Sequence, residues 1–244
     1  MRGTDAVDRA RLRPVLAAAT LLTLLPVLLQ CSRPAPPHPV PPATSPPASS
    51  ASAPPVTAAT EPVTEPVTVA DLGASWRPGC PVEPAQLRRI RLRYMGFDGQ
   101  THQGELIVHQ DLVADVTEVF EQLYRLGYPI ERMQTVDYYP SADDELSMED
   151  NNTSGFNCRA IPGTGRWAQH AYGRAIDLNP RLNPCRYADG TFEPHNAATY
   201  LARDRTDAGI LHHGDPTVRT FTDRGWHWGG DWSTPVDYQH FERP

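Results

Sequence analysis

The sequence predicts a domain of the α+β class, and three local patterns support this prediction. Residues 87–94 alternate apolar and charged side chains, which is the pattern of a half-buried strand. Residues 104–109 follow a turn signal and are expected to form the returning strand, so the two segments should pair as a hairpin. Apolar side chains between residues 113 and 124 recur at helical spacing instead. Strands and helices in separate stretches of the chain are typical of a sheet with segregated helices.

The first elements are bounded by residues with a local structural preference. Asp98-Gly99 supplies the turn of the hairpin. Asp111 can cap the helix that follows, and Gly127 and Pro129 end it. A further strand is expected over residues 133–138.

The second half of the chain contains shorter signals. Residues 175–178 form a short apolar run that predicts a buried strand. Asp215-Pro216 begins a second helix, and Gly225 lies just past its end. The segments 226–232 and 236–241 should return to the sheet beside Asp177.

Two N-terminal segments are expected to lie outside the folded domain. Residues 1–31 combine arginines with an apolar run over 15–29, which is too short for a membrane span of about 20 residues but suits a signal peptide. Cleavage with lipidation of Cys31, an uncleaved anchor and plain secretion stay open. Residues 32–75 are rich in Pro, Ala, Ser and Thr, so we expect a disordered tether with too little apolar surface to offset ordering entropy. The domain then spans residues 76–244.

The composition excludes several functional classes. All 22 basic residues are arginine, whereas the S-x-x-K motif of penicillin-binding carboxypeptidases and the phosphate-binding P-loop both need lysine. Neither an H-E-x-x-H nor a G-x-S-x-G motif is present. The formal net charge of -7 and the lack of a basic run argue against nucleic acid as a partner.

Two short segments carry the strongest functional signal. They are His170-Ala171-Tyr172-Gly173-Arg174-Ala175-Ile176-Asp177 and, near the C-terminus, Asp237-Tyr238-Gln239-His240. Two histidines and one carboxylate are a ligand set of catalytic zinc, which keeps a fourth position open for water. A further carboxylate nearby can take the proton of that water. The segments therefore predict a hydrolytic zinc site.

The spacing of these residues requires the chain to fold back. In a straight strand, His170 and Asp177 would be about 23 Å apart, whereas ligand atoms lie about 2 Å from zinc. Gly173 is the expected reversal point because glycine accepts positive φ. Asp237 and His240 would face opposite sides of a regular strand, so we expect a turn or bulge between them.

The pattern H-x-x-G-x-A-x-D, followed by D-x-x-H, resembles the VanY-type zinc D-alanyl-D-alanine carboxypeptidases and the related phage L-alanyl-D-glutamate endopeptidases. The flanking segments 156–159, 225–232 and 237–241 agree, and the likeness extends from about Cys80 to the C-terminus. The resemblance implies the Hedgehog and DD-peptidase fold, an antiparallel sheet with helices packed mainly on one side. Ala168 departs from the family, which often has serine there, and this puts a hydrogen bond near the first ligand in question.

The resemblance implies a role for each site residue. His170, Asp177 and His240 would bind Zn²⁺, and Asp237 would be the general base. Arg159 would polarise the scissile carbonyl or stabilise the oxyanion, with a structural salt bridge as its alternative role.

Other polar residues have weaker signals. Arg166 or Arg174 could receive a peptide carboxylate. His227 and Asp231 compete as metal ligands, but we expect them to shape the cleft instead. The adjacent histidines, His212 and His213, are expected to lie in a loop.

Three cysteines lie in the predicted domain. Outside the cytosol a disulfide is expected, and from spacing alone any pair could form and leave one thiol over. The resemblance favours Cys80 with Cys158, which leaves Cys185.

The N-terminal segments predict an exported protein of the cell envelope, either tethered to the membrane or secreted, and we expect a monomer. The resemblance implies an enzyme that acts on peptidoglycan stem peptides. D-alanyl-D-alanine carboxypeptidase activity is the first expectation, and an L-alanyl-D-glutamate or other cell-wall endopeptidase is the second. A non-catalytic, zinc-containing wall-binding module is an alternative of a different class. Asp237 argues against that alternative, since a binding module needs no base beside its metal.

Overall fold

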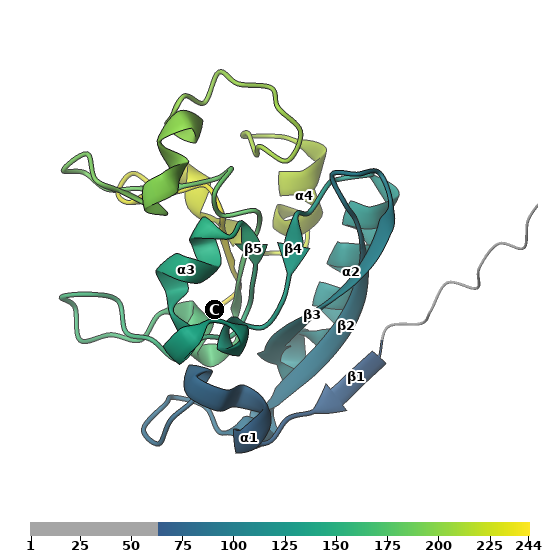
Figure 1. Ribbon diagram of the computed structural model, residues 1–244, viewed down its shortest axis with the longest axis vertical. Coiled ribbons are helices and arrows are strands. Elements are labelled where there is room, and N and C mark those ends of the chain that lie inside the picture. Colours follow the sequence, from purple (N-terminus) through teal and green to yellow (C-terminus); the bar gives the residue numbers. More distant parts are fainter. Residues whose placement is uncertain (1–62) are drawn as a thin grey trace, which may run out of the picture. The chain divides into compact units, whose positions relative to one another are not determined.

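The computed structural model describes residues 63–244 (Figure 1). The predicted signal peptide, residues 1–31, lies outside the described residues, and so does the predicted tether up to residue 62. Along the described part of the chain, no helix combines the length and apolar character needed to cross a membrane. Mainly antiparallel sheets and separate helices build the domain, in agreement with the predicted α+β class.

A long hairpin dominates the first sheet. β2 (Leu87–Met95) pairs with β3 (Thr101–His109) in antiparallel register, and β1 (Val63–Pro66) joins the other edge of β2. The predicted hairpin with its turn at Asp98-Gly99 is confirmed, and both strands are slightly longer than predicted.

The helix α2 (Val113–Arg125) lies along this hairpin (Figure 1). Its buried residues pack on apolar side chains of β2 and β3 in the main core: Val116, Val119, Phe120 and Leu123 against Ile90, Leu92, Leu106 and Val108. Gly127, at φ +67°, follows its end as predicted. Asp111 does not cap the helix, because the chain enters α2 through an extra turn, η3 (Gln110–Leu112), in which the Asp111 carboxylate pairs with Arg174.

The opposite face of the hairpin is covered by the N-terminal segment. Thr68 and Asp71 form a capping box at the start of α1 (Val69–Leu72), which continues into η1 (Gly73–Ser75). These turns belong to a second core cluster, which contains Val67, Leu72, Val82, Leu87, Ile107, Phe156 and Cys158. Both faces of β3 are therefore covered in its second half, which explains the consecutive apolar residues Leu106, Ile107 and Val108.

Residues 63–75 were assigned to the tether by their composition, and the structure corrects this boundary. β1 forms four register pairs with β2, and the side chain of Leu72 is completely buried. The few apolar residues of this segment become buried because a distant strand pair and the loop at Phe156 supply their partners. Composition alone contains no sign of those partners.

The predicted strand over residues 133–138 is wrong beyond its first residue. β4 (Arg132–Met133) is short and pairs in parallel with β5 (Asn152–Thr153). The Asn152 side chain then accepts from the Gln134 N–H at 2.9 Å and donates to the Gln134 carbonyl at 3.0 Å. This side chain takes the backbone groups that a longer strand would pair.

The C-terminal half contributes two small antiparallel sheets. One has the order β6-β11-β9 and the other β10-β7-β8. Their strands are β6 (Ala175–Asp177), β7 (Cys185–Arg186), β8 (Phe192–Glu193), β9 (His227–Trp228), β10 (Val236–Asp237) and β11 (His240–Glu242). Residues 236–241 were expected to join one sheet, but the chain changes sheets between β10 and β11.

Short helices connect these strands. Asp143 caps α3 (Asp144–Glu149), and α4 (Pro216–Thr222) begins with proline and is followed by Gly225, as predicted. The remaining 3₁₀ helices are η2 (Pro84–Gln86), η4 (Val136–Tyr138), η5 (Pro140–Ala142), η6 (Gln169–Tyr172), η7 (His195–Leu201) and η8 (Gly229–Asp231).

One disulfide joins Cys80 to Cys158, with their Cα atoms 6.0 Å apart. This is the pairing that the resemblance favours. Cys185 is a buried free thiol. The disulfide fixes the segment after α1 to the chain directly before Arg159.

The packing of the N-terminal segment is tested by Leu72→Ala. We expect this change to lower the free energy of unfolding by about 2–5 kcal/mol, because it removes a fully buried side chain. Val69→Ala is the matched control: Val69 lies in the same helix but is 55% exposed, so a change below about 0.5 kcal/mol is expected. Urea denaturation measures both, and equal effects would contradict the described packing.

Candidate metal and catalytic site

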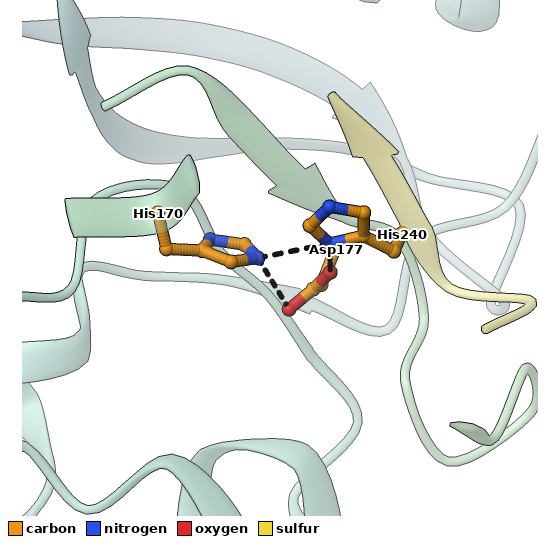
Figure 2. Close-up of side chains that lie close together, drawn as sticks. All are labelled: His170, Asp177 and His240. Carbon is orange, nitrogen blue, oxygen red and sulfur yellow. Dashed lines mark hydrogen bonds and ion pairs between the residues drawn. The ribbon is translucent and has the colours of Figure 1, made fainter. Parts of the chain in front are cut away.

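Three side chains of the predicted zinc site converge in the structure (Figure 2). His170 comes from η6, Asp177 from the end of β6 and His240 from the start of β11. His170 Nε2 lies 3.0 Å from Asp177 Oδ2 and 3.2 Å from His240 Nδ1, and His240 Nδ1 lies 3.1 Å from Asp177 Oδ1. All three residues are buried. The arrangement is a compact triangle of one carboxylate and two imidazoles.

Local backbone structure explains how residues 170 and 177 meet. Gly173 ends η6 in the left-handed conformation, at φ +67°, and the chain then turns back into β6. A Cβ at this position would come within 2.6 Å of the His109 backbone nitrogen, so only glycine fits. The predicted reversal at Gly173 is confirmed.

The third residue of the triangle is placed by strand pairing. His240 lies directly opposite Asp177 in the antiparallel register of β6 and β11. Opposite residues of such a pair have Cβ atoms about 5 Å apart, which brings their polar atoms together. The expected break between Asp237 and His240 is also present, as the change of sheet between β10 and β11.

The hydrogen bonds of both imidazoles determine which nitrogen faces the triangle. His170 Nδ1 lies 2.6 Å from the Gly155 carbonyl, which can only accept, so Nδ1 donates and, in the neutral ring that a metal ion would bind, Nε2 carries the lone pair. His240 Nε2 lies 3.2 Å from Glu242 Oε2, which directs Nδ1 inward. Carboxylates and carbonyls commonly orient metal-binding histidines in this way.

Glu242 was missed in the sequence analysis. The available signal was the spacing His240-x-Glu242, because residues two apart on a strand face the same side. Its hydrogen bond with His240 holds the pKa of Glu242 below its usual value.

The charges of the triangle are strongly linked. Burial opposes ionisation of Asp177, but the charge of His170 and the hydrogen bonds from both histidines outweigh burial and hold its pKa well below the usual range. Burial also disfavours the charged form of His240, yet its bonds to Asp177 and Glu242 raise its pKa to about 10. A metal ion would take the place of the proton here, since a ligating imidazole nitrogen must be deprotonated.

The residues fit a zinc ion in number, type and spacing. In a tetrahedral site with bonds of about 2.0 Å, ligand atoms lie about 3.3 Å apart. His170 Nε2 and His240 Nδ1 are 3.2 Å apart, and they lie 3.0 and 3.1 Å from different oxygens of the Asp177 carboxylate. Three protein ligands leave one position for water or substrate, which is the pattern of catalytic zinc. Metal binding by His170, Asp177 and His240 stays a prediction that this geometry supports.

Asp237 lies on β10, opposite Cys185, and lines the same cleft as the triangle. Its Oδ1 is buried, and no donor among the described residues reaches it. Burial raises the pKa of Asp237 to about 6; the Asp177 charge adds to this rise, whereas His240, His170 and Arg159 oppose it. This carboxylate is therefore poised to accept and return a proton.

Gly229 allows Asp237 and His240 to lie close to η8, the turn that precedes them. A Cβ at Gly229 in η8 would lie 2.6 Å from the Asp237 carbonyl and 3.3 Å from the His240 Cβ. Any larger residue would push β10 and the start of β11 away from η8.

Arg159 also lines this cleft, and α3 holds it in place. Its Nε lies 2.8 Å from Asp144 Oδ2, and the side chain is 34% exposed. Burial disfavours the charge, but Asp144, Asp177 and Asp237 outweigh it and raise the pKa of Arg159. The salt bridge named as the alternative role is thus present in a residue that also lines the cleft.

The cleft has a volume of about 1210 Å³ and is lined by residues from several elements. Arg166 is exposed at its rim, whereas Arg174 bonds to the Arg243 carbonyl and to Asp111. Trp232 also lines it, with its ring 5.3 Å from that of His240.

His227 and Asp231 were expected to shape this cleft, and the structure corrects that expectation. His227 is exposed on β9, and Asp231 pairs with His213 at 2.8 Å. Neither residue lines the cleft. His227 faces outward because Trp228, the other residue of β9, takes the buried position, whereas Asp231 lies at the end of η8.

A second cluster of side chains that could bind a metal ion consists of Glu145, Glu149 and His195. His195 is largely exposed, and Glu145 Oε1 already accepts from both the backbone and the ring of His195. Exposed groups that satisfy one another in this way have no need of an ion, so the buried triangle is the better metal site.

Residues 162–243 match the family model of D-alanyl-D-alanine carboxypeptidases. No curated protein and no solved structure matches the chain. The matched residues include the whole triangle and Asp237, whereas Arg159 precedes them. The match supports a peptidase related to this family.

The orienting role of Glu242 is tested by Glu242→Ala. We expect the zinc dissociation constant to rise about 10- to 100-fold, because His240 loses the partner that directs Nδ1 inward. Competition with a chromogenic chelator measures it. Glu118→Ala is the control, since Glu118 lies on α2 and pairs with Arg224 at 3.3 Å. Equal zinc affinity in both variants would contradict the role.

Proposed function

We propose that the chain is a zinc-dependent D-alanyl-D-alanine carboxypeptidase of the VanY type that acts on peptidoglycan stem peptides. The observation that carries the proposal is the buried triangle of His170, Asp177 and His240 with the buried Asp237 carboxylate, whose Oδ1 has no donor among the described residues, in the same cleft. The family match over residues 162–243 supports the same class of enzyme.

The roles of the residues follow from their positions. When bound, zinc supplies Lewis-acid activation of water and of a carbonyl group. Asp237 accepts the proton of the attacking water and returns it to the leaving amine. Its raised pKa suits this exchange, because an efficient base has a pKa near the working pH. Arg159, held by Asp144, stabilises the negative charge that develops on the carbonyl oxygen.

The size of the cleft supports a second candidate, an L-alanyl-D-glutamate or other cell-wall endopeptidase. About 1210 Å³ exceeds the 300–1,000 Å³ of ordinary small-molecule sites, so several residues of a peptide fit. The zinc ligands and base would be the same in both enzymes, and the position of the peptide in the cleft would select the bond.

The remaining proposals concern the fold and the location of the protein. We propose the Hedgehog and DD-peptidase fold, and export of a monomer that is tethered to the membrane through residues 1–62 or secreted. The disulfide between Cys80 and Cys158 supports export, since such bonds persist in oxidising compartments.

The activity is tested by digesting purified stem pentapeptides with the purified chain and weighing the products by mass spectrometry. We expect loss of one terminal alanine, its disappearance after chelation and its return with added zinc, because the proposed chemistry needs the metal. Cleavage inside the stem would move the assignment to an endopeptidase. Bound zinc without any cleavage would favour the wall-binding module.

The base is tested by Asp237→Asn. We expect kcat to fall about 10²- to 10⁴-fold while zinc stays bound, because the amide cannot accept the proton. Asp231→Asn is the matched control, since Asp231 pairs with His213 outside the cleft. Unchanged turnover in Asp237→Asn would remove this residue from the mechanism.

A further inference from the structure

The three tryptophans near the C-terminus have different surroundings. Trp226 and Trp228 are 2% and 3% exposed and belong to the main core. Their indole N–H groups donate to the Asp115 carboxylate and to the Tyr238 carbonyl. Trp232 is only half-buried and lines the cleft, and neither core cluster of the described residues contains it. Core packing therefore does not account for the Trp232 side chain.

The ring of Trp232 lies beside a proposed metal ligand. Its centroid is 5.3 Å from the centroid of the His240 imidazole, and the two ring planes are inclined by 51°. At this separation two aromatic rings are in contact, so no side chain of a bound molecule fits between them. The indole therefore forms a wall of the cleft directly at the triangle.

The backbone holds this wall in place relative to the base and the triangle. The Trp232 N–H donates to the Gly229 carbonyl at 3.1 Å, which ties the residue to η8. Position 229 in turn packs so closely on the Asp237 carbonyl and the His240 Cβ that only glycine fits there. A large group beside the indole would have to displace this turn or rotate the ring, and close-packed protein resists both changes.

A peptide hydrolysed at the triangle brings its reacting residues to this wall. Consecutive Cα atoms are about 3.8 Å apart, so the residues on both sides of the scissile bond lie within reach of His240 and Trp232. In a stem peptide that ends in D-alanyl-D-alanine, both of these residues have only a methyl side chain. The cleft as a whole, at about 1210 Å³, is large enough for several residues. Selection for size therefore acts only at the wall.

We propose that Trp232 determines the specificity of the site, by limiting the side chain of a residue that flanks the scissile bond to about the size of alanine. This inference rests on the proposed peptidase function. The ring contacts the substrate and excludes longer side chains by steric overlap. It takes no part in proton transfer, so its effect falls on the choice of substrate.

Trp232→Val tests the proposal, because valine stays apolar and leaves space in place of the indole. The probes are a stem pentapeptide that ends in D-alanyl-D-alanine and two analogues, in which D-leucine replaces the last or the preceding alanine. We measure kcat/KM for release of the terminal residue. For one analogue, we expect its value relative to the alanine peptide to be about 10- to 100-fold higher in Trp232→Val than in the wild type. Trp232→Phe retains most of the wall and should change this ratio much less.

The ratio does not depend on how much of the enzyme is folded or loaded with zinc, so a loss of stability cannot imitate the result. Trp167→Val is the matched control. Trp167 also lines the cleft, but its ring lies 5.7 Å from the Arg77 guanidinium and packs on the second core cluster. Its replacement should leave the ratio unchanged. An equal shift in both variants, or an unchanged ratio for both analogues in Trp232→Val, would overturn the proposal.

Binding gives the same comparison without turnover. In an Asp237→Asn background, the dissociation constant of one D-leucine analogue, measured by calorimetry relative to that of the alanine peptide, should fall when Trp232 is replaced by valine. Hydrolysis of the alanine peptide by the wild type reports separately on the proposed function. Hydrolysis by the wild type together with unchanged specificity in Trp232→Val would refute the wall alone, whereas a wild type that releases no terminal residue would overturn both.

Discussion

The antiparallel pairing of β6 with β11 is the interaction on which the rest of the site depends. It places His240 opposite Asp177 on the cleft side. The next pair, Ile176 and Phe241, is fully buried on the core side. Phe241 stacks on Phe221 of α4 with ring centroids 4.0 Å apart. Core packing thus fixes the register of the two strands. A slip of one residue would exchange the cleft-facing and core-facing side chains, and the polar triangle would be lost.

A buried carboxylate between two imidazoles is costly unless its charge is compensated. In this protein the compensation comes from His170 and His240, whose outer nitrogens bond to Gly155 and Glu242. These outer bonds turn His170 Nε2 and His240 Nδ1 toward each other. In the neutral rings, the lone pairs of both nitrogens would then be available to one metal ion. The stability of this region and its metal affinity are therefore coupled.

The N-terminal segment contributes to the cleft although it lies far from it in sequence. The disulfide between Cys80 and Cys158 fixes the chain before Arg159, and Arg77 donates to the Cys158 carbonyl at 2.6 Å. Asp144 of α3 then orients the Arg159 guanidinium from the other side. A covalent bond and an ion pair together position Arg159, whose charge interacts with both Asp177 and Asp237.

The sequence by itself determined the features that depend on neighbours in the chain. The β2–β3 hairpin, α2, α4 and the reversal at Gly173 follow from alternation, helical spacing and glycine, which act within a few residues. The spacing of His170, Asp177, Asp237 and His240 indicated a metal site for the same reason, because few other uses need those residue types together. Only the tertiary structure decided what depends on distant partners. Burial of Leu72, the early end of β4, the salt bridge of Arg159 and the orienting bond of Glu242 arise from contacts between remote segments.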